Sequence, residues 1–170
     1  MKSVLFVLFF VVFTCCASPE PGDVFREYTW YNRTGDAGQA VRVGGNNNET
    51  YPDRSIIGNY WVTKAYQPAW TIDLDFATRA ELIVEKILCH DGTYGLGIQL
   101  NDSSWISVPE ADSIQSPQRY YLHHTYPEIP IDLDLLKETG NKFKLRVRKQ
   151  HSWNWPQNLI NGVHVRVYYD

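Results

Sequence analysis

The sequence predicts an all-β protein, and three of its features do so. Apolar and polar residues alternate with a period of two in several short segments, the pattern of strands that bury one face. Turn-forming residues such as Gly, Asn, Asp and Pro recur at close intervals between these segments. No segment has the length and period of a long amphipathic helix. Together these features are typical of a sandwich or barrel of about eight to ten short strands.

Strict alternation marks the clearest strands. Residues 69–76 alternate throughout, which predicts a half-buried strand. Its apolar side chains are expected to share one face: Trp70, Ile72, Leu74 and Phe76. Residues 143–148 and 163–168 alternate apolar residues with mostly basic ones, so we expect the basic side chains to form a solvated outer face rather than a phosphate site. Residues 39–43 alternate more briefly.

Two further strands are expected to form a hairpin. Residues 80–89 are apolar and rich in β-branched side chains, which favours a strand over a short helix. Asp91-Gly92 is a turn signal, and residues 96–100 return as a second strand. Shorter elements complete the chain: an aromatic-rich stretch at 56–62, strands at 105–108 and 129–133, and one helical turn at 135–138.

Residues 129–147 read Ile-Pro-Ile-Asp-Leu-Asp-Leu-Leu-Lys-Glu-Thr-Gly-Asn-Lys-Phe-Lys-Leu-Arg-Val. This passage resembles galactose-binding-like jelly-roll domains, in which a proline-containing strand leads to a Leu-Leu-Lys turn, a Gly-Asn reversal and an alternating strand. Residues 70–76 and 162–170 look like an earlier strand and the last strand of that fold. Such domains occur as carbohydrate-binding modules and as sugar-binding accessory domains of glycoside hydrolases. The resemblance implies a two-sheet antiparallel β-sandwich of jelly-roll type.

The N-terminus predicts export. Lys2 precedes an unbroken apolar run at residues 4–13, and small residues follow it. The run is shorter than the roughly 20 residues that span a bilayer, so residues 1–17 are expected to be a secretory signal peptide. We therefore expect a secreted or extracellular-surface protein whose residues 18–170 form a single β-sandwich domain. Alternatively, Cys15 or Cys16 carries a lipid anchor.

Composition argues against three other classes of protein: disulfide-stabilised, nucleic-acid-binding and membrane-spanning. Beyond the expected signal peptide, Cys89 is the single cysteine, so no internal disulfide can form and the fold depends on burial. Cys89 follows an apolar run, which indicates a buried thiol. The formal net charge is −3 with mixed signs, which gives no footprint for nucleic acid. No second segment is apolar enough to span a membrane.

Aromatic residues carry the main functional signal, since the chain has 6 Trp and 11 Tyr. Residues 151–158 lie between two predicted strands and are expected to form a surface loop. Its candidate ligand-binding residues are His151, Trp153, Asn154 and Trp155. The C–H face of a sugar ring stacks on indole, while amides bond its hydroxyls. The alternative is that both indoles fold inward and close one end of the sandwich.

Two other segments are expected to assist this loop. Residues 120–126 contain Tyr120 and Tyr121, and two adjacent histidines follow them. Because adjacent residues on a strand point to opposite faces, the two histidines do not readily bind one metal ion, so a polar-aromatic surface patch is favoured over a metal site. Residues 30–36 form an expected loop that begins with Trp30.

The resemblance also implies a possible structural calcium ion near the chain termini. Its candidate ligands are Glu27, Asp36 and Asp170, although the sequence has no compact acidic loop of the kind that calcium prefers. Asn32, Asn48 and Asn101 begin glycosylation sequons in expected loops, which matter only in a eukaryotic host.

These observations predict a carbohydrate-binding domain that recognises polysaccharide through aromatic loop residues. One alternative is a glycan-active enzyme or its accessory domain. Asp73 and Asp75 share one expected strand face, but nothing places two carboxylates at the separation that glycoside hydrolysis needs. The other alternative is a structural or adhesive surface protein without a sugar site. We expect a binding protein rather than an enzyme.

Overall fold

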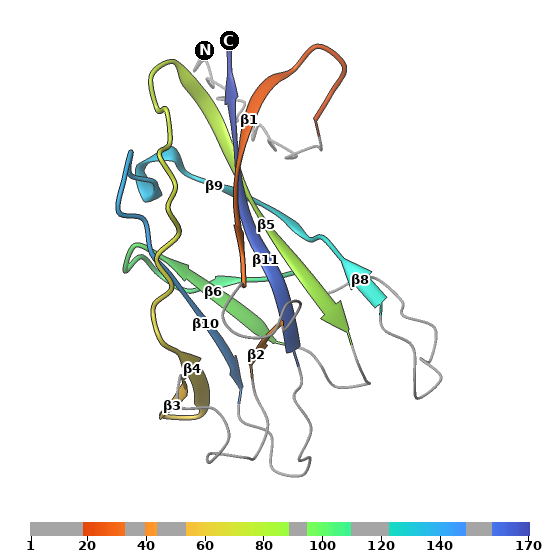
Figure 1. Ribbon diagram of the computed structural model, residues 1–170, viewed down its shortest axis with the longest axis vertical. Helices are drawn as coiled ribbons and strands as arrows, with labels where there is room; N and C mark the ends of the chain where they lie inside the picture. Colours follow the sequence, from red (N-terminus) through yellow and green to blue (C-terminus); the bar gives the residue numbers. More distant parts are fainter. Residues whose placement is uncertain (1–18, 33–39, 44–53, 89–94, 110–122, 149–157) are drawn as a thin grey trace, which may run out of the picture.

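The computed structural model describes residues 19–32, 40–43, 54–88, 95–109, 123–148 and 158–170. These residues form two antiparallel sheets and a single short 3₁₀ helix, η1 (Leu133–Leu135), without an α-helix among them (Figure 1). The predicted all-β class and two-sheet sandwich are therefore confirmed, while the jelly-roll type stays a prediction. None of the described elements is a helix that could cross a membrane.

Two 12-residue strands form the centre of the six-stranded sheet. β5 (Ala77–Leu88) and β11 (Asn158–Tyr169) pair along most of their length. On the far side of β11, β1 (Val24–Tyr31) pairs with its second half and β2 (Val41–Val43) with its first. On the far side of β5 lie β8 (His123–Thr125) and β9 (Glu128–Ile131).

The five-stranded sheet has β10 (Phe143–Arg148) at its centre. On one side β10 pairs with β4 (Tyr60–Thr63), which forms a hairpin with β3 (Arg54–Ile57). On the other side it pairs with β6 (Leu96–Leu100), which pairs with β7 (Ile106–Ser107). The aromatic-rich stretch at 56–62 is therefore the β3–β4 hairpin.

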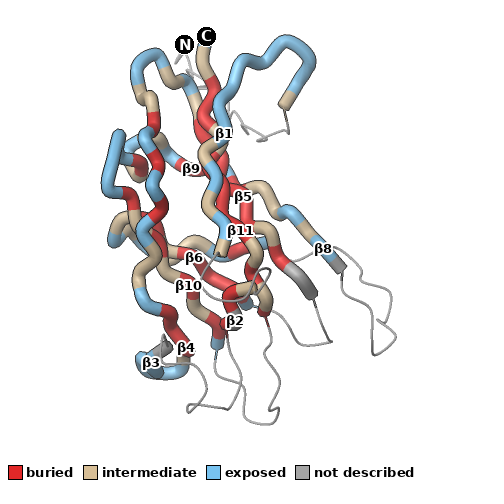
Figure 2. The backbone as a smooth tube through the Cα atoms, in the orientation of Figure 1, coloured by how far each residue is buried: buried red, intermediate tan, exposed pale blue. Residues whose placement is uncertain are grey.

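The core lies between the sheets and follows from the alternation of the central strands. Phe143, Leu145 and Val147 of β10 are buried, and so are Val163, Val165 and Val167 of β11. Burying such a side chain stabilises the fold by roughly 1.5–3 kcal/mol. Figure 2 shows the buried residues along the middle strands of both sheets, while β1 is largely exposed. Both predicted strands, 143–148 and 163–168, are confirmed. The expected solvated outer face of 163–168 was wrong, because His164 and Tyr168 are buried on that side and the Arg166 side chain is only 12% exposed.

Residues 69–76 are not a strand, and this expectation was wrong. Trp70 and Ile72 are buried, but Phe76 is 87% exposed with φ of 59°. The backbone finds scattered partners rather than a neighbouring strand: the Ile72 amide donates to Glu138 and the Asp73 amide to the Tyr28 hydroxyl. An extended segment that packs against a core edge shows the same alternation as a strand.

The expected hairpin of residues 80–89 and 96–100 was also wrong. Both segments are strands, but β5 belongs to the six-stranded sheet and β6 to the five-stranded sheet, where it pairs with β10 and β7. A turn signal between two strands does not decide whether the chain reverses within one sheet or crosses to the other. The turn at residues 89–94, with Cys89, lies outside the described residues.

The Gly-Asn reversal is held by one buried amide. Gly140 has φ of 70°, which glycine adopts without steric cost. Asn141 is fully buried and acts through its side chain: its Oδ1 accepts from the Lys137 amide, and its Nδ2 donates to the Lys137 carbonyl. The same Oδ1 accepts from Asn101 Nδ2, which ties this turn to the end of β6. The helical turn lies two residues earlier than predicted, at η1.

Candidate functional site

Most of the predicted binding residues lie outside the described residues. These are the aromatic-loop residues and the tyrosine pair: His151, Trp153, Asn154, Trp155, Tyr120 and Tyr121. The sugar-binding role of this loop stays a prediction. The expected signal peptide at residues 1–17, with Cys15 and Cys16, lies outside them too.

Trp30 lies in β1 rather than in a loop. Its ring centroid is 4.9 Å from that of Phe143, edge to face, and 5.0 Å from that of Tyr66. Trp70 stacks on the same Phe143 ring at 6.5 Å. The half-buried indole of Trp30 thus belongs to an aromatic cluster that packs against the core. Strand β1 went unrecognised because its sequence, VFREYTWY, mixes charged and aromatic residues on both faces.

Two of the expected calcium ligands are described, and they do not lie in a metal-binding group. Glu27 on β1 is paired with Arg166, Oε2 to Nη2 at 3.3 Å, and Asp170 is the exposed C-terminal residue. Across the described residues no three His, Cys, Asp or Glu side chains are grouped as metal ligands. Asp36 lies outside them, so the calcium ion stays a prediction.

The outer face of the six-stranded sheet is a compensated charge network. Arg166 Nη1 lies 3.3 Å from Glu81 Oε2 and 3.2 Å from Glu128 Oε1, in addition to its pair with Glu27. Burial opposes its charge, but hydrogen bonds with Tyr168 and Glu128 outweigh burial and raise the pKa of Arg166. The Tyr168 hydroxyl donates to Glu81 at 2.7 Å. One arginine therefore pairs with carboxylates from three strands, and Arg79 adds a second cation at Glu81.

His164 is buried beside this network. Its Nε2 lies 3.9 Å from Glu85 Oε2 and its Nδ1 4.0 Å from Glu27 Oε1, with the ring of Tyr31 packed edge to face at 5.1 Å. Burial lowers the pKa of His164, although both carboxylates act in the opposite direction. Gly162 leaves the space that the imidazole fills, since a Cβ there would lie 2.9 Å from Nε2. These contacts serve packing.

The five-stranded sheet carries an open groove of about 360 Å³ on its outer face. It runs across β3, β4, β10 and β6 to the residue before β7. Its lining combines aromatic, aliphatic, basic and neutral polar side chains: Ser55, Ile57, Tyr60, Val62, Thr63, Lys64, Ala65, Gln99, Trp105, Lys144 and Arg146. Gln99 is held at the wall because its Nε2 donates to the Ser103 carbonyl at 2.7 Å.

Arg146 occupies the middle of this groove between two rings. Its guanidinium carbon lies 4.4 Å from the ring centroid of Tyr60 and 4.4 Å from that of Trp105. Gly97 lies directly opposite Arg146 on β6, and a Cβ there would lie 3.3 Å from Arg146 Cγ and Nε. The missing side chain at position 97 lets the arginine extend across the sheet to reach Trp105.

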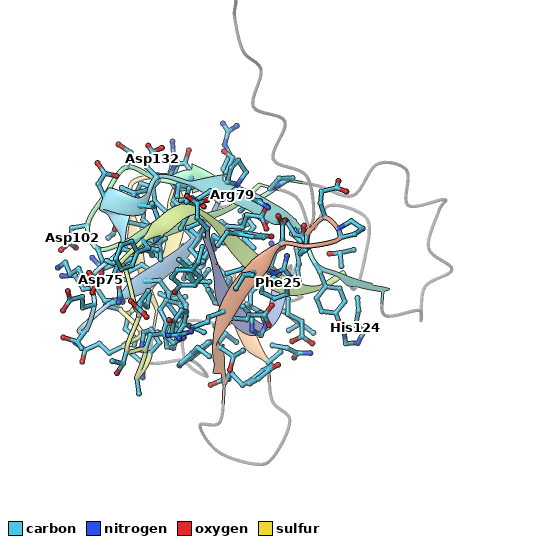
Figure 3. All side chains as sticks on the ribbon, turned by 90° about the horizontal axis from the view of Figure 1, so that it is seen from above. Phe25, Asp75, Arg79, Asp102, His124 and Asp132 are labelled. Carbon is cyan, nitrogen blue, oxygen red and sulfur yellow. The ribbon has the colours of Figure 1, made fainter. Side chains whose placement is uncertain are left out.

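Positive charge dominates the groove. Lys64, Lys144 and Arg146 line it, and none of its described lining residues is a carboxylate. Asp102 lies beside it, where Lys142 Nζ at 2.5 Å lowers the pKa of the aspartate and Lys144 Nζ lies at 3.9 Å. In Figure 3 Asp102 lies at the periphery of the molecule, far from Phe25 and His124 of the six-stranded sheet.

The sequence contained only part of the signal for this groove. The basic residues of 143–148 were expected to form a solvated face, and they do lie on the outer face. That expectation missed the rings on either side of Arg146, because Tyr60 and Trp105 lie far apart in sequence. Only the strand order β4-β10-β6-β7 brings them together. The Gly97–Arg146 pairing needs the same register.

Asn101 is a poor glycan acceptor in the folded chain. Its Nδ2, the atom that a glycan would modify, donates to the Leu135 carbonyl and to Asn141 Oδ1, both at 2.8 Å. Its Oδ1 accepts from the Lys142 amide. The Asn101 side chain is thus part of the turn structure, while Asn48 lies outside the described residues.

Comparison with known proteins identifies similar structures only. No family model and no curated protein matches the chain. A β-porphyranase of glycoside hydrolase family 86 from the human gut bacterium Bacteroides plebeius is 12% identical, with a TM-score of 0.46 over 87% of this chain. The family 86 enzyme BuGH86, solved in complex with neoagarooctaose, is 10% identical, with a TM-score of 0.47 over 87%. This chain covers 21% and 19% of the lengths of these two proteins.

Proposed function

We propose that this protein is a secreted or surface-held carbohydrate-binding domain that recognises polysaccharide through the groove of the five-stranded sheet. The observation that carries the proposal is the combination of two aromatic side chains with hydrogen-bonding groups in one open groove. Its volume of about 360 Å³ falls in the range of about 300–1,000 Å³ that is usual for ligand sites.

The groove offers both kinds of contact that a sugar needs. Tyr60 and Trp105 are half-buried, so they are held by the fold and still line the open side of the sheet. The C–H groups of a pyranose pack on such rings, and the tyrosine hydroxyl and indole N–H add hydrogen bonds at the edge. Gln99, Ser55 and Arg146 supply further hydrogen-bonding groups for sugar hydroxyls.

The open form of the groove suits a chain rather than a terminal sugar. Its lining residues come from four adjacent strands and the residue before a fifth, so a ligand crosses the sheet rather than entering a closed cavity. The predicted aromatic loop begins where β10 ends, and Arg148 at that end pairs with Tyr60. The predicted sugar-binding role of residues 151–158 is a separate candidate, which a variant of that loop tests on its own. Export through the signal peptide brings this surface to extracellular glycans.

Affinity electrophoresis on a panel of polysaccharides tests the proposal, followed by calorimetry on each hit. The double variant Tyr60→Ala, Trp105→Ala is expected to weaken binding at least about tenfold, equivalent to about 1.4 kcal/mol. Phe76→Ala is the control, because Phe76 is an 87% exposed aromatic residue that precedes β5 of the other sheet. Circular dichroism and thermal unfolding establish that each variant is folded.

Two results would contradict the proposal. If the folded full chain binds no polysaccharide in a broad panel, carbohydrate binding is wrong. If the double variant binds as tightly as the unaltered protein, the groove is wrong. A parallel variant, Trp153→Ala, Trp155→Ala, separates the groove from the loop: loss of binding in this variant alone would place the site on the loop.

A further inference from the structure

We propose that the groove selects anionic polysaccharides and binds their sulfate or carboxylate groups at Arg146. This inference rests on the proposed carbohydrate binding and adds the chemical class of the ligand. The structural basis is the guanidinium held between the rings of Tyr60 and Trp105.

The contacts of Arg146 with the two rings leave its N–H hydrogen-bond donors available to a ligand. A guanidinium is planar, and its five N–H donors point outward in that plane. The guanidinium carbon lies over the rings of Tyr60 and Trp105, 4.4 Å from each centroid, and the attraction of a cation to a ring face requires no N–H donor. Ring contacts favour the cation without neutralising its charge. The edge fits the paired oxygens of a sulfate ester or a carboxylate, in the two-donor geometry that arginine forms with oxyanions.

Arg166 on the opposite sheet shows how this fold compensates an arginine that has a structural role. Arg166 lies within 3.3 Å of carboxylate oxygens of Glu27, Glu81 and Glu128. For Arg146, no ion pair with any described carboxylate is formed, and its contacts are the two rings. The two arginines lie on outer faces of the same sandwich, and an oxyanion of a ligand would give Arg146 the kind of counter-charge that the three glutamates give Arg166.

Neighbouring lysines add to the positive potential. Lys144 lies two residues before Arg146 on β10. Its ammonium is 3.9 Å from the Asp102 carboxylate, while the ammonium of Lys142 is 2.5 Å from the same carboxylate. One carboxylate is therefore shared by two lysines. Lys64 lines the same groove from the other side. Like charges gathered along a groove attract a polyanion and raise its association rate.

Gly97 acts as a positioning residue for Arg146. A methyl group at this position would lie 3.3 Å from Arg146 Cγ and Nε and 3.5 Å from the Ile106 carbonyl. The side chain of Arg146 must then give by a few tenths of an ångström. Gly97 has no positive φ, so alanine is compatible with its backbone. Gly97→Ala thus displaces the guanidinium without changing the charge of the protein.

Calorimetry on the full chain tests the inference with one neutral polysaccharide and its chemically sulfated form. A polyuronate replaces sulfate with carboxylate, and poly-glutamate offers carboxylates without sugar. We expect at least tenfold tighter binding of the sulfated form or the polyuronate than of the neutral chain in dilute buffer. This preference should shrink in 0.5 M NaCl, where screening is stronger. Which of the two anionic chains binds more tightly identifies the oxyanion.

Variants separate a site from general attraction. Arg146→Gln should remove most of the preference for the anionic chain, Arg146→Lys should retain part of it, and Gly97→Ala should weaken it at constant net charge. Arg26→Gln makes the same charge change on β1 of the other sheet and should have little effect. Thermal unfolding confirms that each variant is folded.

The outcomes distinguish this inference from the proposed function. Equal binding of neutral and sulfated chains, lost in Tyr60→Ala, Trp105→Ala, would overturn the anionic preference and leave carbohydrate binding intact. Equal binding of poly-glutamate and polyuronate would overturn both, because charge alone would explain it. An anionic preference that survives in Arg146→Gln would overturn the role of Arg146.

Discussion

Replacing Asn141 by alanine should cost the fold roughly 2–3 kcal/mol. The side chain is fully buried and makes three hydrogen bonds, at 3.0 Å from the Lys137 amide, 2.8 Å from Asn101 Nδ2 and 2.6 Å to the Lys137 carbonyl. Each bond contributes a net of about 1 kcal/mol. The sum is discounted because Lys137 is exposed and can regain water, and because Asn101 keeps its bond to Leu135.

Urea unfolding followed by tryptophan fluorescence measures this loss. For a domain of this size, 2–3 kcal/mol corresponds to a fall in Tm of roughly 4–12 °C. Thr139→Ala is the control, since Thr139 is an exposed residue of the same turn and such changes stay within about 0.5 kcal/mol. A loss below about 0.5 kcal/mol in Asn141→Ala would refute the reasoning that this amide holds the turn to β6.

Three further predictions concern stability. The pKa of His164 is lowered by burial, so the unfolded chain takes up a proton near pH 6.5 before the folded chain does, and the unfolding free energy should fall as pH drops below about 6.5. Urea unfolding at pH 7.5 and 5.5 should show a smaller fall in this free energy for His164→Gln than for the unaltered protein. An equal fall in both proteins would contradict this origin. Phe76→Gly should leave the unfolding free energy unchanged or raise it by up to about 1 kcal/mol, because φ of 59° is strained for phenylalanine. A fall in the unfolding free energy of about 3 kcal/mol or more, as for a core phenylalanine, would mean that Phe76 is buried. Tyr168→Phe should cost about 1.5–3 kcal/mol in the same assay, since it removes the hydrogen bond to the buried Glu81 carboxylate. A variant as stable as the unaltered protein would show that Arg79 and Arg166 satisfy Glu81 without the hydroxyl.

Alternation of apolar and polar residues predicted a strand correctly where the segment pairs with another strand on each side in its sheet. β10 alternates because one face meets the core and the other faces outward, and this strand is confirmed. The second half of β11 is also confirmed as a strand, but its residues opposite the core, His164 and Tyr168, are buried as well. The same pattern misled at residues 69–76, where Trp70 and Ile72 are buried by an edge of the core rather than by sheet pairing. Periodicity reports which side chains are buried and not what the backbone bonds to.

Pairing was the part of the fold that the sequence could not supply. β5 and β6 are neighbours in the chain but lie in different sheets, while β1 and β11 pair from opposite ends of the domain. Such long-range contacts depend on the total burial of competing arrangements and not on a local signal. The register Gly97 to Arg146, on which the groove depends, belongs to this class.

Aromatic content in the sequence did not locate a site among the described residues. Trp30 was expected at a surface loop and instead packs on Phe143 in the core. Tyr60 and Trp105 were not singled out, although they line the groove with Arg146. A tryptophan in a sequence can be structural or functional, and only its neighbours in space decide which.

Backbone and indole N–H chemical shifts during titration with a bound oligosaccharide test the central claim most directly. If polysaccharide binds across the five-stranded sheet, the largest changes should occur at Gly97, Gln99, Arg146 and the Trp105 indole. Residues of β5 and the outer face of β11, such as Glu81 and His164, should change little. Changes concentrated on β5 and β11, with none at the Trp105 indole, would contradict the account.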